Sequence, residues 1–138
     1  MAIVPIGMVP LLQVYDMPEA LAFYQGLLGF EIISASPVVD TPEGRFSHWV
    51  WIELGPAQVM LNTAYDEGRR PTQRVAEQQR WHRDTCLYFD VADVDSVHAE
   101  LRSKIPEIKP PTNTRYGMRQ LYVSDLDGYN LCFQTRIS

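Results

Sequence analysis

Apolar and polar positions follow two different periods along the first half of the chain. Alternating or continuous apolar runs predict strands over residues 9–14, 30–35, 45–54 and 57–63. Between the first two strands, apolar side chains recur at helical spacing and predict a helix over residues 18–28. The first half therefore has the order strand, helix and three strands.

The same order returns in the second half after a polar stretch. The stretch carries no hydrophobic period apart from a short helix that we expect around residues 75–80. The elements predicted beyond it are a strand at 85–91, a helix from Asp93 or Asp95 to about Lys104, an edge strand near 107–109, and a hairpin of strands 116–124 and 129–136.

Two copies of one order predict a duplicated unit. We expect an α+β fold in which two tandem βαβββ modules form a curved mixed sheet around a cleft, with the helices on the outer face. The whole chain, 1–138, is then one domain. Module one covers about residues 7–63, the connector about 64–83 and module two about 84–136.

Composition narrows the range of functions. The chain has 138 residues, of which 46% are hydrophobic, and this predicts a domain with a real core. A net charge of −5 without a basic stripe argues against a nucleic-acid partner. No apolar run is long enough to span a membrane, and the N-terminal residues lack a secretory pattern, so we expect a cytoplasmic protein. Two cysteines are too few for a disulfide framework.

Four segments carry a resemblance to a known superfamily. They are Val14-Tyr15-Asp16, residues 23–30 with the pattern Phe-Tyr-x-x-Leu-Leu-Gly-Phe, residues 91–95, and the turn Asp125-Leu126-Asp127-Gly128-Tyr129. The chain resembles, over essentially its whole length, the vicinal oxygen chelate superfamily, which includes glyoxalase I, bleomycin-resistance proteins and extradiol dioxygenases. The resemblance implies the fold but does not fix the chemistry.

Metal-dependent members of this family hold a divalent ion with one His, Gln or Glu on each of four strands. The resemblance carries these positions onto Val9, Met60, Cys86 and Cys132. None of them offers imidazole or carboxylate, so we expect no metal and no cofactor. Three converging sulfurs could still hold Cu(I) or Zn²⁺, although we interpret them as apolar fillers of a dry pocket. A lasting disulfide between the cysteines is not expected in the cytoplasm.

Strand alternation predicts which side chains line the cleft instead. Trp49 and Trp51 share one face of their strand and could stack on a planar ligand, or could fill a core or a dimer interface. Tyr116 and Arg119, at the start of the last hairpin, could reach the polar end of a ligand. The other predicted ligand-binding residues are Gln58, Met60, Asn62, Cys86, Tyr88, Cys132 and Gln134.

Few groups suit acid–base catalysis. His48 and Tyr116 are weak candidates, and we interpret His48 as a structural residue because no partner carboxylate is visible. His82 and the arginines of the connector are interpreted as solvated, the arginines with nearby acids such as Glu67 and Glu77 as partners.

These features favour a metal-free protein, similar to bleomycin-resistance proteins, that binds a neutral or aromatic small molecule in an apolar cleft, including resistance by sequestration. We expect it to form a homodimer, as the family does. The alternatives are a lyase, isomerase or dioxygenase-like enzyme of the glyoxalase type with a non-standard or absent metal site, and a scaffold with a filled cleft that only binds a partner.

Overall fold

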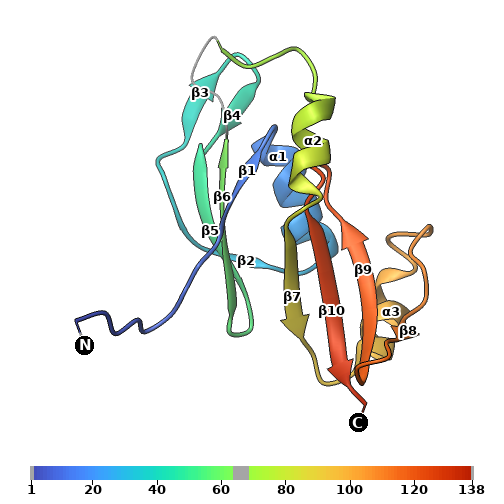
Figure 1. Ribbon diagram of the computed structural model, residues 1–138. Helices are drawn as coiled ribbons and strands as arrows, with labels where there is room; N and C mark the ends of the chain where they lie inside the picture. The colour runs from blue at the N-terminus through green and yellow to red at the C-terminus, as the bar shows by residue number, and fades with distance from the viewer. Residues whose placement is uncertain (1, 64–68, 138) are drawn as a thin grey trace. The chain divides into compact units, whose positions relative to one another are not determined.

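The computed structural model describes residues 2–63 and 69–137 (Figure 1). Two compact units divide the chain, residues 1–70 and residues 71–138. Each contains one four-stranded mixed sheet, and the two sheets have corresponding strand orders, β1-β6-β5-β2 and β7-β10-β9-β8. The predicted α+β fold of two tandem modules is therefore confirmed.

The first unit begins with β1 (Leu11–Val14), which pairs in parallel with β6 (Ala57–Thr63). β6 continues antiparallel to β5 (Trp49–Leu54), and β5 to β2 (Glu31–Ala35). Buried side chains alternate along β5 and β6, as expected for a sheet with one face in the core. The fully buried residues on this face are Val50, Ile52, Val59 and Leu61.

The predicted helix at 18–28 is present, but it begins as an α-helix and continues as a π-helix. Asp16 caps α1 (Met17–Leu21) by accepting a hydrogen bond from the backbone N–H of Glu19 at 2.9 Å. The segment continues as a π-helical stretch, η1 (Ala22–Leu27). Tyr24 lies in this stretch, fully buried, with edge-on ring contacts to Phe23 and Phe30. Packing of three aromatic rings thus accompanies the wider helical turn.

The predicted strand at 45–54 is broken in the structure. The first residues of that strand and the residues before it instead make a separate hairpin of β3 (Val39–Thr41) and β4 (Gly44–Phe46). Arg45 pairs with Asp40 across this hairpin at 3.1 Å. Aromatic alternation alone does not distinguish one long strand from two strands that belong to different sheets.

The second unit repeats the arrangement. β7 (Cys86–Asp90) pairs in parallel with β10 (Asn130–Arg136), which pairs antiparallel with β9 (Met118–Ser124). The edge strand is β8 (Thr112–Asn113), so the prediction of an edge strand near 107–109 was wrong, because that range ends before the observed strand begins. Helix α3 (Val94–Leu101) contacts β9 and β10. It begins at Asp93, whose carboxylate accepts from two backbone N–H groups.

The connector contributes α2 (Ala76–His82), which belongs to the second unit. His82, interpreted from the sequence as solvated, instead stacks on Tyr129 with ring centroids 4.1 Å apart. Its Nδ1 also lies 2.7 Å from the backbone oxygen of Asp127. α2 is therefore fastened to the turn between β9 and β10.

Two arginines of the connector have partners far away in sequence. Arg70 pairs with Asp16 at 3.2 Å, and its guanidinium carbon lies 3.8 Å from the ring centroid of Tyr15. Arg74 lies 3.6 Å from the carboxylate of Asp127. The interpretation of these arginines as solvated was wrong for both, and Glu67, named as a nearby partner, lies outside the described residues.

No helix in the described part of the chain is long and apolar enough to cross a membrane.

Candidate functional sites on the two sheets

Each sheet has a face opposite its buried row, and we call this the open face. On the first sheet, register places Trp51 beside Met60 and Trp49 beside Asn62. Met60 in turn pairs with Leu11, and Asn62 with Gln13. The open face of the first sheet therefore consists of Leu11, Gln13, Trp49, Trp51, Glu53, Gln58, Met60 and Asn62.

Two indole rings dominate this face. Trp49 and Trp51 are partly exposed, and their ring centroids lie 6.4 Å apart at an interplanar angle of 63°. The Asn62 amide donates to the side-chain oxygen of Gln13 at 3.2 Å. The indole N–H of Trp51 is shielded from solvent and has no hydrogen-bond partner among the described residues. A buried indole N–H usually has an acceptor, so this donor is suited to a ligand oxygen or nitrogen.

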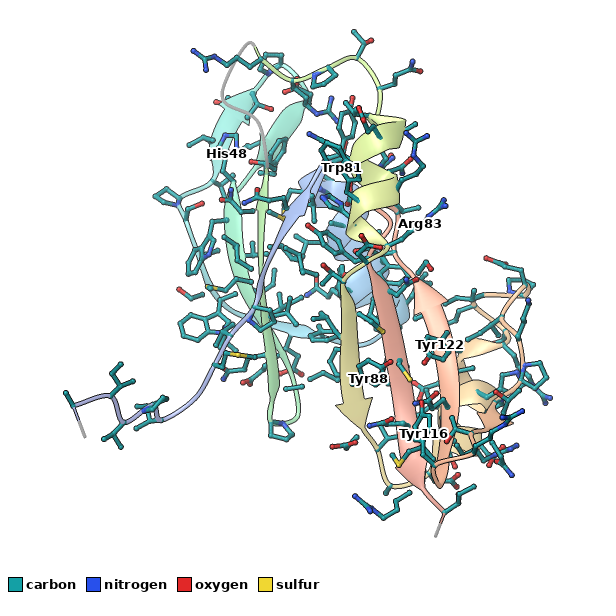
Figure 2. The ribbon with its side chains drawn as sticks, in the orientation of Figure 1. His48, Trp81, Arg83, Tyr88, Tyr116 and Tyr122 are labelled. Atoms are coloured by element: carbon teal, nitrogen blue, oxygen red, sulfur yellow. The ribbon has the colours of Figure 1, made fainter. Side chains whose placement is uncertain are left out.

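The open face of the second sheet carries phenols, amides and thiols. Cys132 on β10 pairs with Tyr88 on β7 and with Tyr122 on β9, so the cysteine lies between the two tyrosines. The two hydroxyl oxygens are 3.4 Å apart, while Cys132 is fully buried. Figure 2 shows Tyr88, Tyr116 and Tyr122 over the strands of this sheet. The tyrosines thus form the accessible surface here.

The neighbouring row of this face is a hydrogen-bonded chain of amides. Gln120 donates to Gln134 at 3.0 Å, and Gln134 donates to Asp90 at 2.9 Å. Tyr122 donates to the amide oxygen of Gln120 at 3.1 Å, and Gln120 also donates to the hydroxyl of Tyr116 at 3.2 Å. Gln120 is only 5% exposed, so these bonds satisfy a buried amide.

The surroundings of Tyr122 and of the two cysteines on this face keep these three groups neutral. The hydrogen bond with Tyr88, together with burial, raises the pKa of Tyr122 well above its ordinary value. Burial also raises the pKa of the Cys86 thiol and of the Cys132 thiol. At pH 7 the Tyr122 phenol and both thiols are therefore neutral.

The donor set does not fit a catalytic divalent ion. Val9 has no donor atom, Met60 offers only a thioether, and both thiols have raised pKa values, which disfavours the thiolate form that a metal needs. Among residues 2–63 and 69–137, no three His, Cys, Asp or Glu side chains gather in a metal-binding arrangement.

Several predicted site residues share these two faces. Trp49, Trp51, Gln58, Met60 and Asn62 lie together on the first sheet. On the second, register places Cys86 two residues before Tyr88 on the same face, beside the row of Cys132 and Gln134. Tyr116 joins them through its bond to Gln120.

Two candidates lie elsewhere. Arg119 shares the face of the buried Leu121, and its Nε and Nη2 groups each donate to the Asp95 carboxylate at 2.9 Å. His48 lies on the side of the buried Val50, where its Nδ1 is 2.8 Å from the hydroxyl of Thr63. Neither belongs to an open face.

Three further residues of the second face, Asp90, Gln120 and Tyr122, were not among the predicted site residues. The signal was present, because Leu121 and Val123 point to the core and alternation then turns Gln120 and Tyr122 the other way. Asp90 continues the alternation of Cys86 and Tyr88.

Solved structures of similar fold include proteins that bind antibiotics. An antibiotic binding protein, TnmS3, from Streptomyces sp. CB03234 is 24% identical with a TM-score of 0.64, and the alignment covers 99% of this chain and 98% of that one. The bleomycin-binding protein of Streptomyces verticillus, solved with copper(II)-bleomycin, is 19% identical with a TM-score of 0.64 and coverage of 99% and 98%. TioX from Micromonospora sp. ML1 is 18% identical with a TM-score of 0.67 and coverage of 96% and 97%. These likenesses show a shared fold.

A search of curated proteins found no significant match. A family model, by contrast, matches residues 5–133, nearly the whole chain. Together with the duplicated strand order, this match shows that the chain belongs to the Glyoxalase/Bleomycin resistance protein/Dioxygenase superfamily.

Proposed function

We propose that this protein binds a planar, neutral aromatic compound without turning it over, in the manner of a sequestering resistance protein. The observation that carries the proposal is the pair Trp49 and Trp51 on the open face of the first sheet. Indole rings offer large flat surfaces for stacking, and the unpartnered N–H of Trp51 adds a donor for a ligand acceptor.

The surroundings of the tryptophans support the same ligand class. Amides of Gln58 and Asn62 and the flexible thioether of Met60 lie along the adjacent strand. Such a face combines apolar area with uncharged hydrogen-bonding groups, a mixture typical of small-molecule sites. Two relatives of the same fold are an antibiotic binding protein and a bleomycin-binding protein, which agrees with this proposal.

The enzymatic alternative has no comparable support. The two candidate acid–base groups are engaged within their own units, His48 with Thr63 and Tyr116 with Gln120. These contacts give both side chains structural roles, so we propose binding rather than lyase or isomerase activity.

The test is a thermal-shift and fluorescence screen against planar antibiotics and aromatic metabolites. A compound that binds the native state raises the unfolding temperature, and stacking on the indoles quenches their fluorescence. Trp51→Phe should weaken binding by about tenfold, the loss expected when a stacked residue with a polar contact is replaced.

The chain offers a matched control, because its third tryptophan, Trp81, lies on α2 and is 64% exposed. Trp81→Phe should leave affinity unchanged. If no planar compound stabilises the protein, or if Trp81→Phe weakens binding as much as Trp51→Phe, the proposal is wrong.

We also propose that the protein forms a homodimer. The N-terminal segment exposes Ile3, Val4, Ile6 and Met8 by 75% or more each, an unusual apolar surface for a single chain. Light scattering after gel filtration should give twice the chain mass, and deletion of residues 2–8 should shift the equilibrium towards the monomer. A monomeric full-length protein at micromolar concentration would contradict this.

A further inference from the structure

The amide row on the second sheet has a fixed direction, set at one end by Asp90. A carboxylate only accepts hydrogen bonds, so Gln134 must turn its NH₂ group towards Asp90. Its oxygen then faces Gln120, and this requires the NH₂ group of Gln120 to point towards Gln134. Each amide is oriented by the one before it.

The orientation of the amides also fixes the direction of the hydrogen bond made by the Tyr122 hydroxyl. Because the NH₂ group of Gln120 faces Gln134 and Tyr116, its oxygen faces Tyr122 and accepts the phenolic proton at 3.1 Å. Tyr122 has a single proton, which is thereby committed inward. Its oxygen keeps lone pairs directed to the open face, where Tyr88 lies 3.4 Å away.

Tyr88 is the opposite case. Its hydroxyl proton has weak partners, the Cys86 thiol and the Tyr122 oxygen 3.4 Å away, and the residue is 55% exposed. A ligand acceptor can therefore take this proton at small cost. The two neighbouring oxygens thus present one donor and one acceptor, side by side.

We propose that Tyr88 and Tyr122 recognise the edge of a planar cyclic amide, with Tyr88 donating to its carbonyl oxygen and Tyr122 accepting from the adjacent N–H. Asp90 is a positioning residue for this site, since it acts through Gln134 and Gln120. The inference concerns the second unit by itself and goes beyond the proposal for the tryptophan pair of the first sheet.

The donor of Tyr88 and the acceptor of Tyr122 together disfavour close analogues of a cyclic amide. An ionised carboxylate offers two acceptors, and one would face the lone pairs of Tyr122. An N-alkylated amide has no N–H and leaves Tyr122 without a donor.

The test uses three probes with the same fused-ring skeleton in isothermal titration calorimetry: phenanthridinone, N-methylphenanthridinone and phenanthridine. The wild-type protein should bind phenanthridinone about tenfold more tightly than either analogue, since each analogue loses a hydrogen bond to a site that needs one. If all three bind equally, the amide-edge proposal is overturned and the binding of planar aromatic compounds stands. If none binds, the amide-edge proposal is overturned too, while the screen with Trp51→Phe tests the tryptophan pair separately.

Variants test the direction of the hydrogen-bonded chain that runs from Asp90 to Tyr122. Tyr88→Phe should bring phenanthridinone to the affinity of phenanthridine, and Tyr122→Phe should abolish discrimination against the N-methyl probe. Asp90→Asn allows the amides to reverse, so the preference for phenanthridinone over its N-methyl derivative should fall by at least about threefold while phenanthridine binds as before.

The control is Asp84→Asn, which removes the same charge from an exposed residue of the same unit. It should preserve the full preference. An Asp90→Asn protein that keeps the full preference, or an Asp84→Asn protein that loses it, would overturn the role of Asp90.

Discussion

The imidazole of His82 lies parallel to the ring of Tyr129, with centroids 4.1 Å apart and an interplanar angle of 10°. The same imidazole bonds the backbone oxygen of Asp127, and Gln79 donates to the backbone oxygen of Leu126 at 2.7 Å. The connector helix α2 is therefore held on the β9–β10 turn by stacking and by two backbone contacts.

His82→Ala should lower the free energy of unfolding by about 1–3 kcal/mol, because it removes a stacked ring and a hydrogen bond. His82→Phe keeps the stack and should recover part of the loss. Urea denaturation measures both, with exposed Arg80→Ala on the same helix as the control. A His82→Ala protein as stable as the control would show that the contact is not formed in solution.

Gly128→Ala should destabilise the protein by more than the addition of one methyl group usually does. Gly128 has φ of +93°, a conformation that residues with a Cβ rarely adopt, and an added Cβ would meet the backbone carbonyl of Gln79. We expect a loss of about 2 kcal/mol or more and partial release of α2. Gly26→Ala, where the added Cβ meets nothing within 4 Å, should cost no stability. Thermal unfolding compares the two, and equal melting temperatures would contradict the prediction.

The ion pair of Asp95 and Arg119 should make stability depend on acid pH. The hydrogen bond from Arg119 lowers the pKa of Asp95 below its ordinary value of 3.8. A group with a lowered pKa in the folded state contributes stability above its unfolded pKa, and this contribution is lost as pH falls through the folded pKa. The urea midpoint of the wild type should therefore fall more steeply below about pH 4 than that of Asp95→Asn. Parallel profiles would contradict it.

The two cysteines should react slowly with iodoacetamide at pH 7. Burial raises both thiol pKa values, which reduces the reactive thiolate. The rate at Cys86, which is partly exposed, should rise about tenfold per pH unit near neutrality. Cys132, fully buried between Tyr88 and Tyr122, should react only after unfolding, or faster in Tyr88→Ala. Mass spectrometry of the peptides separates the sites, and rapid labelling of native Cys132 would contradict its burial.

Asp93→Ala should destabilise the second unit by about 1 kcal/mol, because α3 would lose its N-cap. The Asp93 carboxylate accepts from the backbone N–H groups of Asp95 and Ser96 and from the Ser96 hydroxyl. Asp93→Asn keeps a hydrogen-bond acceptor and should lower the free energy of unfolding by only about a few tenths of a kcal/mol. Chemical denaturation measures the difference, and a neutral alanine variant would argue against the cap.

Local patterns determined much of this protein. Alternation along residues 57–63 and 130–136 placed Leu61 and Leu131 in the core and Met60 and Cys132 on the other face. Asp16 and Asp93 marked both helix starts, because an N-cap bonds within its own turn. The turn at Asp125 likewise depends on neighbours in sequence, with its carboxylate accepting from Asp127 and Tyr129.

Only the tertiary structure decided the long-range partners. The stacking of His82 on Tyr129 and the pairing of Arg70 with Asp16 join segments separated by about fifty residues, and no local period specifies which side chains will meet. The hydrogen-bonded chain from Asp90 to Tyr122 was likewise decided only by the tertiary structure. Alternation predicts the face of each strand, but the hydrogen bonds depend on the register between three strands, and that register is set by the packing of the whole sheet.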